Sequence, residues 1–179
     1  MIILVGASAT GKTATALMLA RKYGLTKAVT TTTREKRVNE VDGVDYFYIS
    51  RDEFIKRNKE NLFVETTLYN NNFYGCGIDQ VKDDRIIVLD PNGLHSFLKL
   101  HNKHIVSFLI TCSESKRKER MMYRGDKEEK IKERLQNDIV DFDIKKIGHT
   151  DFVIDTTNID IDEACDLIYK LYKEKIQNN

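Results

Sequence analysis

The glycines, lysine and threonine near the start of the chain have the spacing of a phosphate-binding loop. Residues 6–13 fit the pattern G-x-x-x-x-G-K-[ST] at every fixed position. In such a loop, backbone N–H groups surround phosphate oxygens, the lysine reaches the outer phosphates and the last hydroxyl helps to hold Mg²⁺. The motif therefore predicts a nucleoside triphosphate site, with Thr13 as the Mg²⁺ ligand. Its residues are Gly6, Ala7, Ser8, Ala9, Thr10, Gly11, Lys12 and Thr13.

The elements that must position this loop are a strand and a helix. Residues 1–5 are apolar and largely β-branched, while residues 14–23 are rich in Ala, Leu and Met and end before Gly24. The loop then lies at the N-terminus of a helix, where the helix dipole favours bound anions. A chance match in a glycine-containing turn is the alternative, and it would lack these flanking elements.

Strands and helices alternate along the rest of the chain. Apolar runs predict strands at 27–30, 46–49, 62–67, 85–90, 105–110 and 152–154. Capping residues and composition predict helices at 50–60, 91–100, 113–123, 126–146 and 161–176. This order is typical of an α/β fold with three layers, in which helices cover a parallel central sheet. Ligands of such sheets bind at the carboxyl ends of the strands, where Gly6, Asp90 and Thr111 fall.

Composition limits the functions that the chain can have. Its 179 residues fit one domain, and 29 Lys and Arg against 28 Asp and Glu give a net charge of +1. A net charge this close to zero does not favour electrostatic binding to nucleic acid or to a membrane surface. No segment approaches the roughly 20 apolar residues of a membrane span, and no signal peptide is expected. Cys76, Cys112 and Cys165 form no C-x-x-C motif, which predicts free thiols and a cytoplasmic protein. We expect a monomer or a homodimer.

Two irregular stretches, residues 31–75 and 117–134, interrupt the alternation, and here the chain resembles the guanylate kinase family. The resemblance covers nearly the whole chain. Its most specific part is Thr32-Thr33-Arg34-x-x-Arg37-x-x-Glu40-Val41-Asp42-Gly43-Val44-Asp45-Tyr46, close to the family's GMP-binding signature. Further matches, in the family's order, are Phe63-Val64-Glu65, Phe73-Tyr74-Gly75, Leu89-Asp90, Arg120-x-x-x-Arg124-Gly125 and Arg134.

The resemblance implies a P-loop NTPase fold with a small GMP-binding insert and a helical lid. It also implies an ATP-dependent nucleoside monophosphate kinase that moves a phosphoryl group from ATP to GMP, with Mg²⁺. The expected single domain has a core of residues 1–30, 76–116 and 135–179. The insert would be residues 31–75 and the lid residues 117–134.

The resemblance also assigns residues to GMP. Arg34 and Arg37 would clamp the phosphate, because their forked guanidinium groups suit a dianion, and Tyr46 and Tyr74 would add phenolic donors. Glu65 would accept the N1–H and 2-amino protons of guanine, a pair of donors that adenine does not present. The other positions implied at the GMP site are Thr30, Glu40, Cys76 and Asp90.

The second irregular stretch is basic. Residues 116–134 contain nine Lys or Arg and five Asp or Glu, a local charge of +4. The resemblance implies that Arg120, Arg124 and Arg134 close over the triphosphate, with Arg120 contacting ATP. Phosphoryl transfer depends chiefly on positioning and on neutralising the transferring group. The residues expected to act in catalysis are Lys12, Arg34, Arg124 and Arg134.

Departures from the family pattern keep alternatives open. Cys76 stands where the family has a hydroxyl that donates to guanine, and Asp90-Pro91-Asn92 replaces a pair of acidic residues. A monophosphate kinase with altered base choice is therefore an alternative. A non-catalytic binding module with this fold is another, although such modules are expected to lose Lys12 and the lid arginines. A GTPase-type switch would have no use for a monophosphate clamp.

Overall fold

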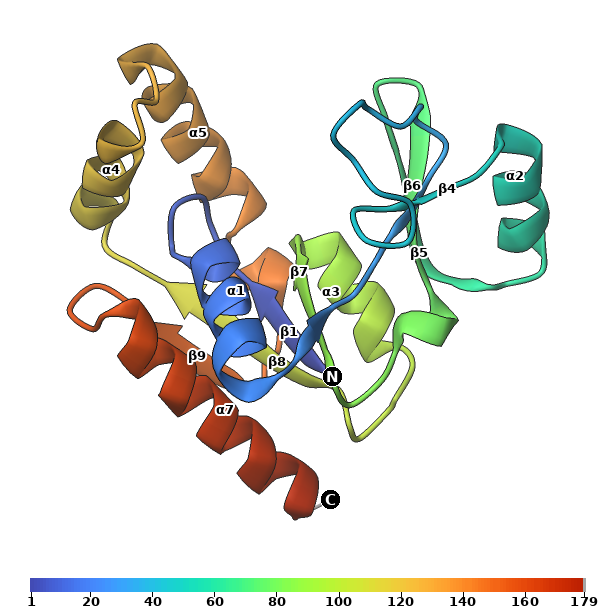
Figure 1. Ribbon diagram of the computed structural model, residues 1–179. Helices are drawn as coiled ribbons and strands as arrows, with labels where there is room; N and C mark the ends of the chain where they lie inside the picture. The colour runs from blue at the N-terminus through green and yellow to red at the C-terminus, as the bar shows by residue number, and fades with distance from the viewer. Residues whose placement is uncertain (179) are drawn as a thin grey trace.

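A five-stranded parallel sheet lies at the centre of the computed structural model, which describes residues 1–178 (Figure 1). Asn179, the last residue of the expected core, lies outside the described residues. The strand order is β2-β7-β1-β8-β9, and every neighbouring pair is parallel. The strands are β1 (Ile2–Val5), β2 (Thr26–Lys27), β7 (Arg85–Leu89), β8 (Val106–Thr111) and β9 (Phe152–Asp155). The predicted parallel α/β sheet is confirmed.

Helices cover both faces of this sheet, because the fully buried strand β1 is apolar on both sides. Ile2 and Leu4 pack with α1 (Lys12–Tyr23) and α7 (Ile161–Gln177), whereas Ile3 and Val5 pack with α3 (Pro91–Leu98). Successive side chains of a strand point to opposite faces, so one four-residue strand contributes to two cores. These three layers hold the carboxyl end of β1, and hence the phosphate loop, in a fixed place.

The insert forms a second, four-stranded sheet of order β4-β3-β6-β5. Its strands are β3 (Thr31–Thr32), β4 (Phe47–Tyr48), β5 (Phe63–Tyr69) and β6 (Asn72–Gly77), and η1 (Ile78–Gln80) returns the chain to the core. Helix α2 (Arg51–Lys59) packs on it through Phe54, whose ring stacks on Phe63 at 4.4 Å and on Phe73 at 5.2 Å. The insert therefore has its own aromatic core.

The strand predicted at 27–30 is wrong in its extent. The chain pairs with β7 only as far as Ala28, whose N–H donates to the Ile86 carbonyl. It then crosses to the other sheet, where the Thr30 carbonyl accepts from the Phe47 N–H and β3 begins at Thr31. One apolar run thus serves two sheets, because its hydrogen-bonding partner changes within it.

The stretch expected to form the lid contains most of α4 (Glu114–Tyr123) and the first part of α5 (Glu128–Asp141). The helix predicted over 126–146 is wrong, since α5 ends at Asp141 and a separate turn, α6 (Ile144–Ile147), follows. Asp143 causes this break, because its carboxylate accepts the N–H of Lys145 and caps a new helix. In Figure 1, α4 and α5 stand on one side of the phosphate loop and the insert sheet stands on the other. Within residues 1–178, no helix has both the length and the apolar character needed to cross a bilayer.

Candidate active site

The phosphate loop leaves β1 in a conformation that its residue types explain. Gly6 has φ +150°, and a Cβ there would collide with the backbone carbonyl of Ile110. Gly11 has φ +103° and caps α1. The Ala7 carbonyl accepts hydrogen bonds from Thr10 Oγ1 at 3.0 Å and from Lys12 Nζ at 2.7 Å, so the loop folds back on itself. The strand–loop–helix arrangement expected of residues 1–23 is confirmed.

Lys12 is the charged group of this loop. Burial lowers the pKa of its ammonium group to about 8, the nearby Asp138 carboxylate opposes the shift and Arg117 adds to it. The ammonium group also lies 5.9 Å from the centre of the Phe142 ring. Lys12 is therefore a cation at neutral pH that has been partly removed from water, which strengthens its attraction for a phosphate oxygen.

A cavity of about 930 Å³ opens beside the loop, which is large enough for a nucleoside triphosphate. Gly11, Lys12 and Thr13 line it from the loop and the start of α1. Arg120 and Tyr123 line it from α4, Arg124 from the residue that follows this helix, and residues 157–161 from the loop before α7 and the first residue of α7. The sequence-predicted lid residues Arg120 and Arg124 thus share one cavity with the loop.

On the insert, the Glu40 carboxylate contacts Arg34, Arg37 and Tyr48. The carboxylate accepts from Arg34 Nη2 at 2.7 Å, from the Arg37 N–H at 2.9 Å and from the Tyr48 hydroxyl at 2.8 Å. The Arg34 contact first, and then the Arg37 backbone, lower the pKa of Glu40 to about 2. The Arg34 guanidinium carbon lies 5.5 Å from the ring centre of Tyr46. Arg34 is therefore held in place, whereas the Arg37 side chain remains 75% exposed.

Glu65 of the insert and Asp90 of the core lie close to each other, and Tyr74 lies on β6 within the insert. Burial raises the pKa of Glu65 and the neighbouring Asp90 raises it further, while the backbone of Cys76 lowers it. Asp90 ends β7 and caps α3 by accepting from the Gly93 N–H at 2.7 Å. The Tyr74 ring lies 6.0 Å from that of Tyr46.

The Cys76 thiol faces the protein interior rather than an open surface. Cys76 is fully buried beside Ile3 and Leu94, and its sulfur lies 3.8 Å from the Gly77 carbonyl. Burial, with smaller effects of Glu65 and Asp79, raises the pKa of the thiol to about 12. Its contact with guanine stays a prediction. What the structure adds is that Cys76 in β6 lies opposite Glu65 in the antiparallel strand β5.

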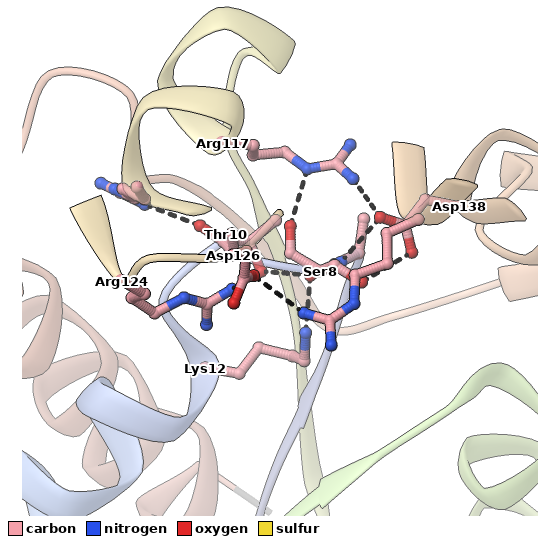
Figure 2. A network of polar contacts seen from close by, with 11 residues as sticks. Ser8, Thr10, Lys12, Arg117, Arg124, Asp126 and Asp138 are labelled. Carbon is pink, nitrogen blue, oxygen red and sulfur yellow. Dashed lines mark hydrogen bonds and ion pairs between the residues drawn. The ribbon is translucent and has the colours of Figure 1, made fainter. Parts of the chain in front are cut away.

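The three lid arginines differ in what holds them. Arg124 Nη2 donates to Asp126 Oδ2 at 3.1 Å (Figure 2). Arg134 Nη1 donates to the same oxygen at 3.0 Å, and both arginine side chains are about half exposed. Arg120 instead donates to the carbonyls of Ala9 and Thr156, at 3.3 and 2.8 Å. Arg120 is thus fixed against the phosphate loop, while Arg124 and Arg134 are half exposed and share the carboxylate of Asp126.

Sequence reasoning missed Tyr48, Arg117 and Asp138. Arg117 and Asp138 form a buried ion pair that contacts Ser8 of the phosphate loop. A helix through this region places Ile131, Arg134 and Asp138 on one face by their spacing of three and seven residues, and that periodicity could have pointed to Asp138. No comparable pattern singles out Arg117 in its run of basic residues.

Comparison with known proteins agrees with this geometry. The sequence profile of the family described as Guanylate kinase matches residues 1–175. The guanylate kinase of Chlorobaculum tepidum is 30% identical, with 94% of this chain and 89% of that protein covered. The guanylate kinase of Helicobacter pylori (strain 26695) is 34% identical, with 76% and 70% covered. A crystal structure of guanylate kinase from Anaplasma phagocytophilum superposes with a TM-score of 0.65 at 25% identity, covering 98% of this chain and 85% of that one. The resemblance seen in the motifs is thereby confirmed, and the chain belongs to the guanylate kinase family.

Proposed function

We propose that this protein transfers the terminal phosphoryl group of ATP to GMP, giving ADP and GDP. One observation carries the proposal. Val5 pairs with Leu89 in neighbouring parallel strands, so the phosphate loop after β1 and Asp90 after β7 leave the sheet side by side. Asp90 in turn lies close enough to Glu65 of the insert to raise the pKa of its carboxyl group. A triphosphate site and a candidate base-reading carboxylate therefore meet at one sheet edge.

ATP binding is assigned to the loop and α4. Residues 6–13 would surround the phosphates, and Arg120 would hold the nucleotide against the loop. Lys12, Arg124 and Arg134 would neutralise charge that develops on the transferring phosphoryl group. The shared cavity of Lys12, Arg120 and Arg124 supports these roles.

GMP binding is assigned to the insert. Arg34 and Arg37 would bind the phosphate, with Tyr46 and Tyr74 as donors, and Glu40 would hold Arg34. Glu65 and Asp90 would face the nucleoside, with Glu65 accepting two protons of guanine. Thr30 and Cys76 complete the assigned set. The contacts of Glu40 with Arg34 and with the Arg37 backbone support a clamp that is formed before GMP arrives.

The reaction then requires alignment more than acid–base chemistry. An oxygen of the GMP phosphate attacks the γ-phosphorus of ATP, and the bond between that phosphorus and the bridging oxygen of ADP breaks. Arg34 reduces the charge repulsion between the two phosphates, and Lys12 stabilises charge on the triphosphate side. Closing Arg124 and Arg134 over the site would exclude water, which limits hydrolysis of ATP.

Thr13 is proposed to hold Mg²⁺ together with ATP. Residues 1–178 contain no cluster of three His, Cys, Asp or Glu side chains suited to a metal. This fits Mg²⁺, which keeps several waters and is bound largely through substrate phosphates. Thr13 lines the cavity next to Lys12, so its hydroxyl is available there. When bound, the ion would supply additional neutralisation of phosphate charge.

The test is ADP release from ATP and Mg²⁺, with GMP, dGMP, AMP, CMP, UMP and dTMP as separate acceptors. We expect the fastest release with GMP and loss of that preference in Glu65→Gln. Glu60→Gln, an exposed carboxylate of the insert, is the matched control and should behave as the unmodified protein. Preference for another base would overturn the guanine assignment. Absence of acceptor-dependent release from folded protein that binds ATP would overturn the kinase assignment.

The remaining proposals concern the cellular location, the partners and the oligomeric state of the enzyme. A net charge of +1 and free cysteines favour a cytoplasmic protein whose partners are small nucleotides rather than nucleic acid. We propose a monomer or a homodimer, which the mass measured by light scattering would test.

A further inference from the structure

Ser8, in the middle of the phosphate loop, is held at all three of its polar groups by residues of α4 and α5. Its N–H donates to Asp138 Oδ2 at 3.0 Å and its hydroxyl donates to Asp138 Oδ1 at 3.1 Å. Its carbonyl accepts from Arg117 Nε at 2.8 Å. Figure 2 shows Arg117 from α4 and Asp138 from α5 converging on this residue. Helices α4 and α5 therefore each contribute one residue that contacts Ser8.

The two side chains also pair with each other, and the pair is buried. Arg117 Nη2 donates to Asp138 Oδ2, and the side chains are 12% and 7% exposed. Within the described chain, neither side chain lines the cavity of about 930 Å³, and neither does Ser8. The pair thus contacts the loop from outside this cavity.

The neighbours of Ser8 show why its position matters. Ala7 supplies the carbonyl that holds Lys12, and Ala9 has φ +60°, a left-handed conformation that is unfavourable for alanine. Such a conformation persists only where the surroundings fix it. Fixing Ser8 at its N–H and its carbonyl restrains the peptide bonds on both sides, and with them the carbonyl that orients Lys12.

We infer that Arg117 and Asp138 are positioning residues that hold the phosphate loop in its ATP-binding conformation through Ser8. The inference rests on the proposed function and deepens it, because it names residues that raise ATP affinity without touching ATP. Two other roles make different predictions. A purely electrostatic role predicts that Asp138 weakens ATP binding, since its charge repels the triphosphate. A purely structural ion pair predicts loss of stability with no selective effect on ATP.

The experiment compares four variants with the unmodified protein: Asp138→Ala, Asp138→Asn, Arg117→Leu and the exchange Arg117→Asp/Asp138→Arg. Glu128→Ala is the matched control, because Glu128 is an exposed carboxylate of α5 that pairs only with Lys132 among the ion pairs of residues 1–178. For each protein we would measure the dissociation constant of a non-hydrolysable ATP analogue, the KM for ATP and for GMP, and the midpoint of thermal unfolding.

Positioning predicts that Asp138→Ala and Arg117→Leu both weaken ATP binding by about tenfold or more, the scale of lost hydrogen bonds to charged groups. The KM for GMP should change by less than about twofold, as expected of a site that the substitution does not touch. Asp138→Asn should be intermediate, because an amide keeps one acceptor for the Ser8 N–H. The exchanged pair restores the ion pair but not the acceptor at position 138, so it should not recover ATP affinity.

Three results would overturn the inference. They are unchanged or tighter ATP binding in Asp138→Ala, recovery of ATP affinity in the exchanged pair, and parallel loss of ATP and GMP affinity. If Asp138→Ala does not fold, Asp138→Asn carries the test, and ATP affinity equal to that of the unmodified protein would count against positioning. Failure of the proposed function is recognised separately, because the unmodified protein and Glu128→Ala would then release no ADP in response to GMP.

Discussion

The Arg34 guanidinium group donates to the Glu40 carboxylate at 2.7 Å, while the same carboxylate accepts the Arg37 N–H. One acidic residue therefore fixes both the side chain of the first basic residue and the backbone of the second. A clamp for a dianionic phosphate needs such an arrangement, because two unrestrained guanidinium groups would lose rotamer entropy on binding. In the proposed clamp, Glu40 would therefore aid the binding of an anion, although it carries the same sign of charge.

We therefore predict that Glu40→Gln raises the KM for GMP by roughly 10-fold to 100-fold, the range expected when a hydrogen bond to a charged group is lost. The KM for ATP should be unchanged, since Glu40 lies on the insert. Steady-state kinetics with each substrate varied in turn would measure both values. Glu35→Gln is the control, because Glu35 is exposed and close in sequence but contacts Arg34 only through its backbone carbonyl. Equal KM values for GMP in the two variants would contradict the clamp.

The pH dependence of GMP use should report on Glu65. Its pKa is raised by burial and then by Asp90, and the proposed contact with guanine requires the ionised carboxylate. The value of kcat/KM for GMP should therefore be full above this pKa and fall as the pH drops through it, at a higher pH than for an ordinary glutamate. Asp90→Asn removes the negative neighbour, which lowers the Glu65 pKa and moves the acidic limb to lower pH.

Asn at position 90 can still cap α3, so this variant should keep its fold. The acidic limb of kcat/KM for ATP in the same variant is the internal control and should stay where it is. A pH profile for GMP that is identical in Asp90→Asn and in the unmodified protein would count against Glu65 as the group that titrates.

The contrast between local and distant contacts explains what the sequence could predict. Residues 1–24 could be assigned in full, because the strand, the phosphate loop and the helix signals are contiguous in sequence. The starts of α3 and α7 were also predicted, and each helix follows an N-cap aspartate, Asp90 and Asp160 respectively. The break between α5 and α6 was missed because a cap at Asp143 competes with an amphipathic pattern that runs through it.

Contacts between distant segments could not be predicted in the same way. Ser8 and Asp138 are separated by 130 residues, and the bond between them depends on how the lid helices dock on the loop. The resemblance to the family identified Arg34, Arg37 and Glu65 as candidates, but it did not indicate that Glu40 accepts from the backbone of Arg37. Residue types predict which chemistry is available, whereas tertiary packing decides which groups restrain one another.

The lid arginines provide a prediction about turnover. Arg124 and Arg134 share Asp126 and are about half exposed, so they can rearrange toward a transferring phosphoryl group without breaking core packing. Arg124→Ala should lower kcat by about 10²- to 10³-fold, as when one preorganised donor to a transition state is removed. The KM for GMP should change little. Lys130→Ala, which removes an exposed lid cation paired with Glu133, is the control and should leave kcat unchanged. Similar kcat losses in both variants would indicate a general charge effect.

The aromatic core of the insert gives a prediction about stability. Phe54 is 1% exposed and stacks between Phe63 and Phe73, so Phe54→Ala should lower the free energy of unfolding by about 3–5 kcal/mol. Ile55→Ala is the matched control on the same helix, because Ile55 is 37% exposed and should cost about 1 kcal/mol or less. Urea denaturation would measure both values. The insert has its own sheet, so the loss should appear first as weaker GMP binding in mild denaturant, with ATP binding retained. Simultaneous loss of both ligands at one urea concentration would instead show that the insert and the core unfold as one unit.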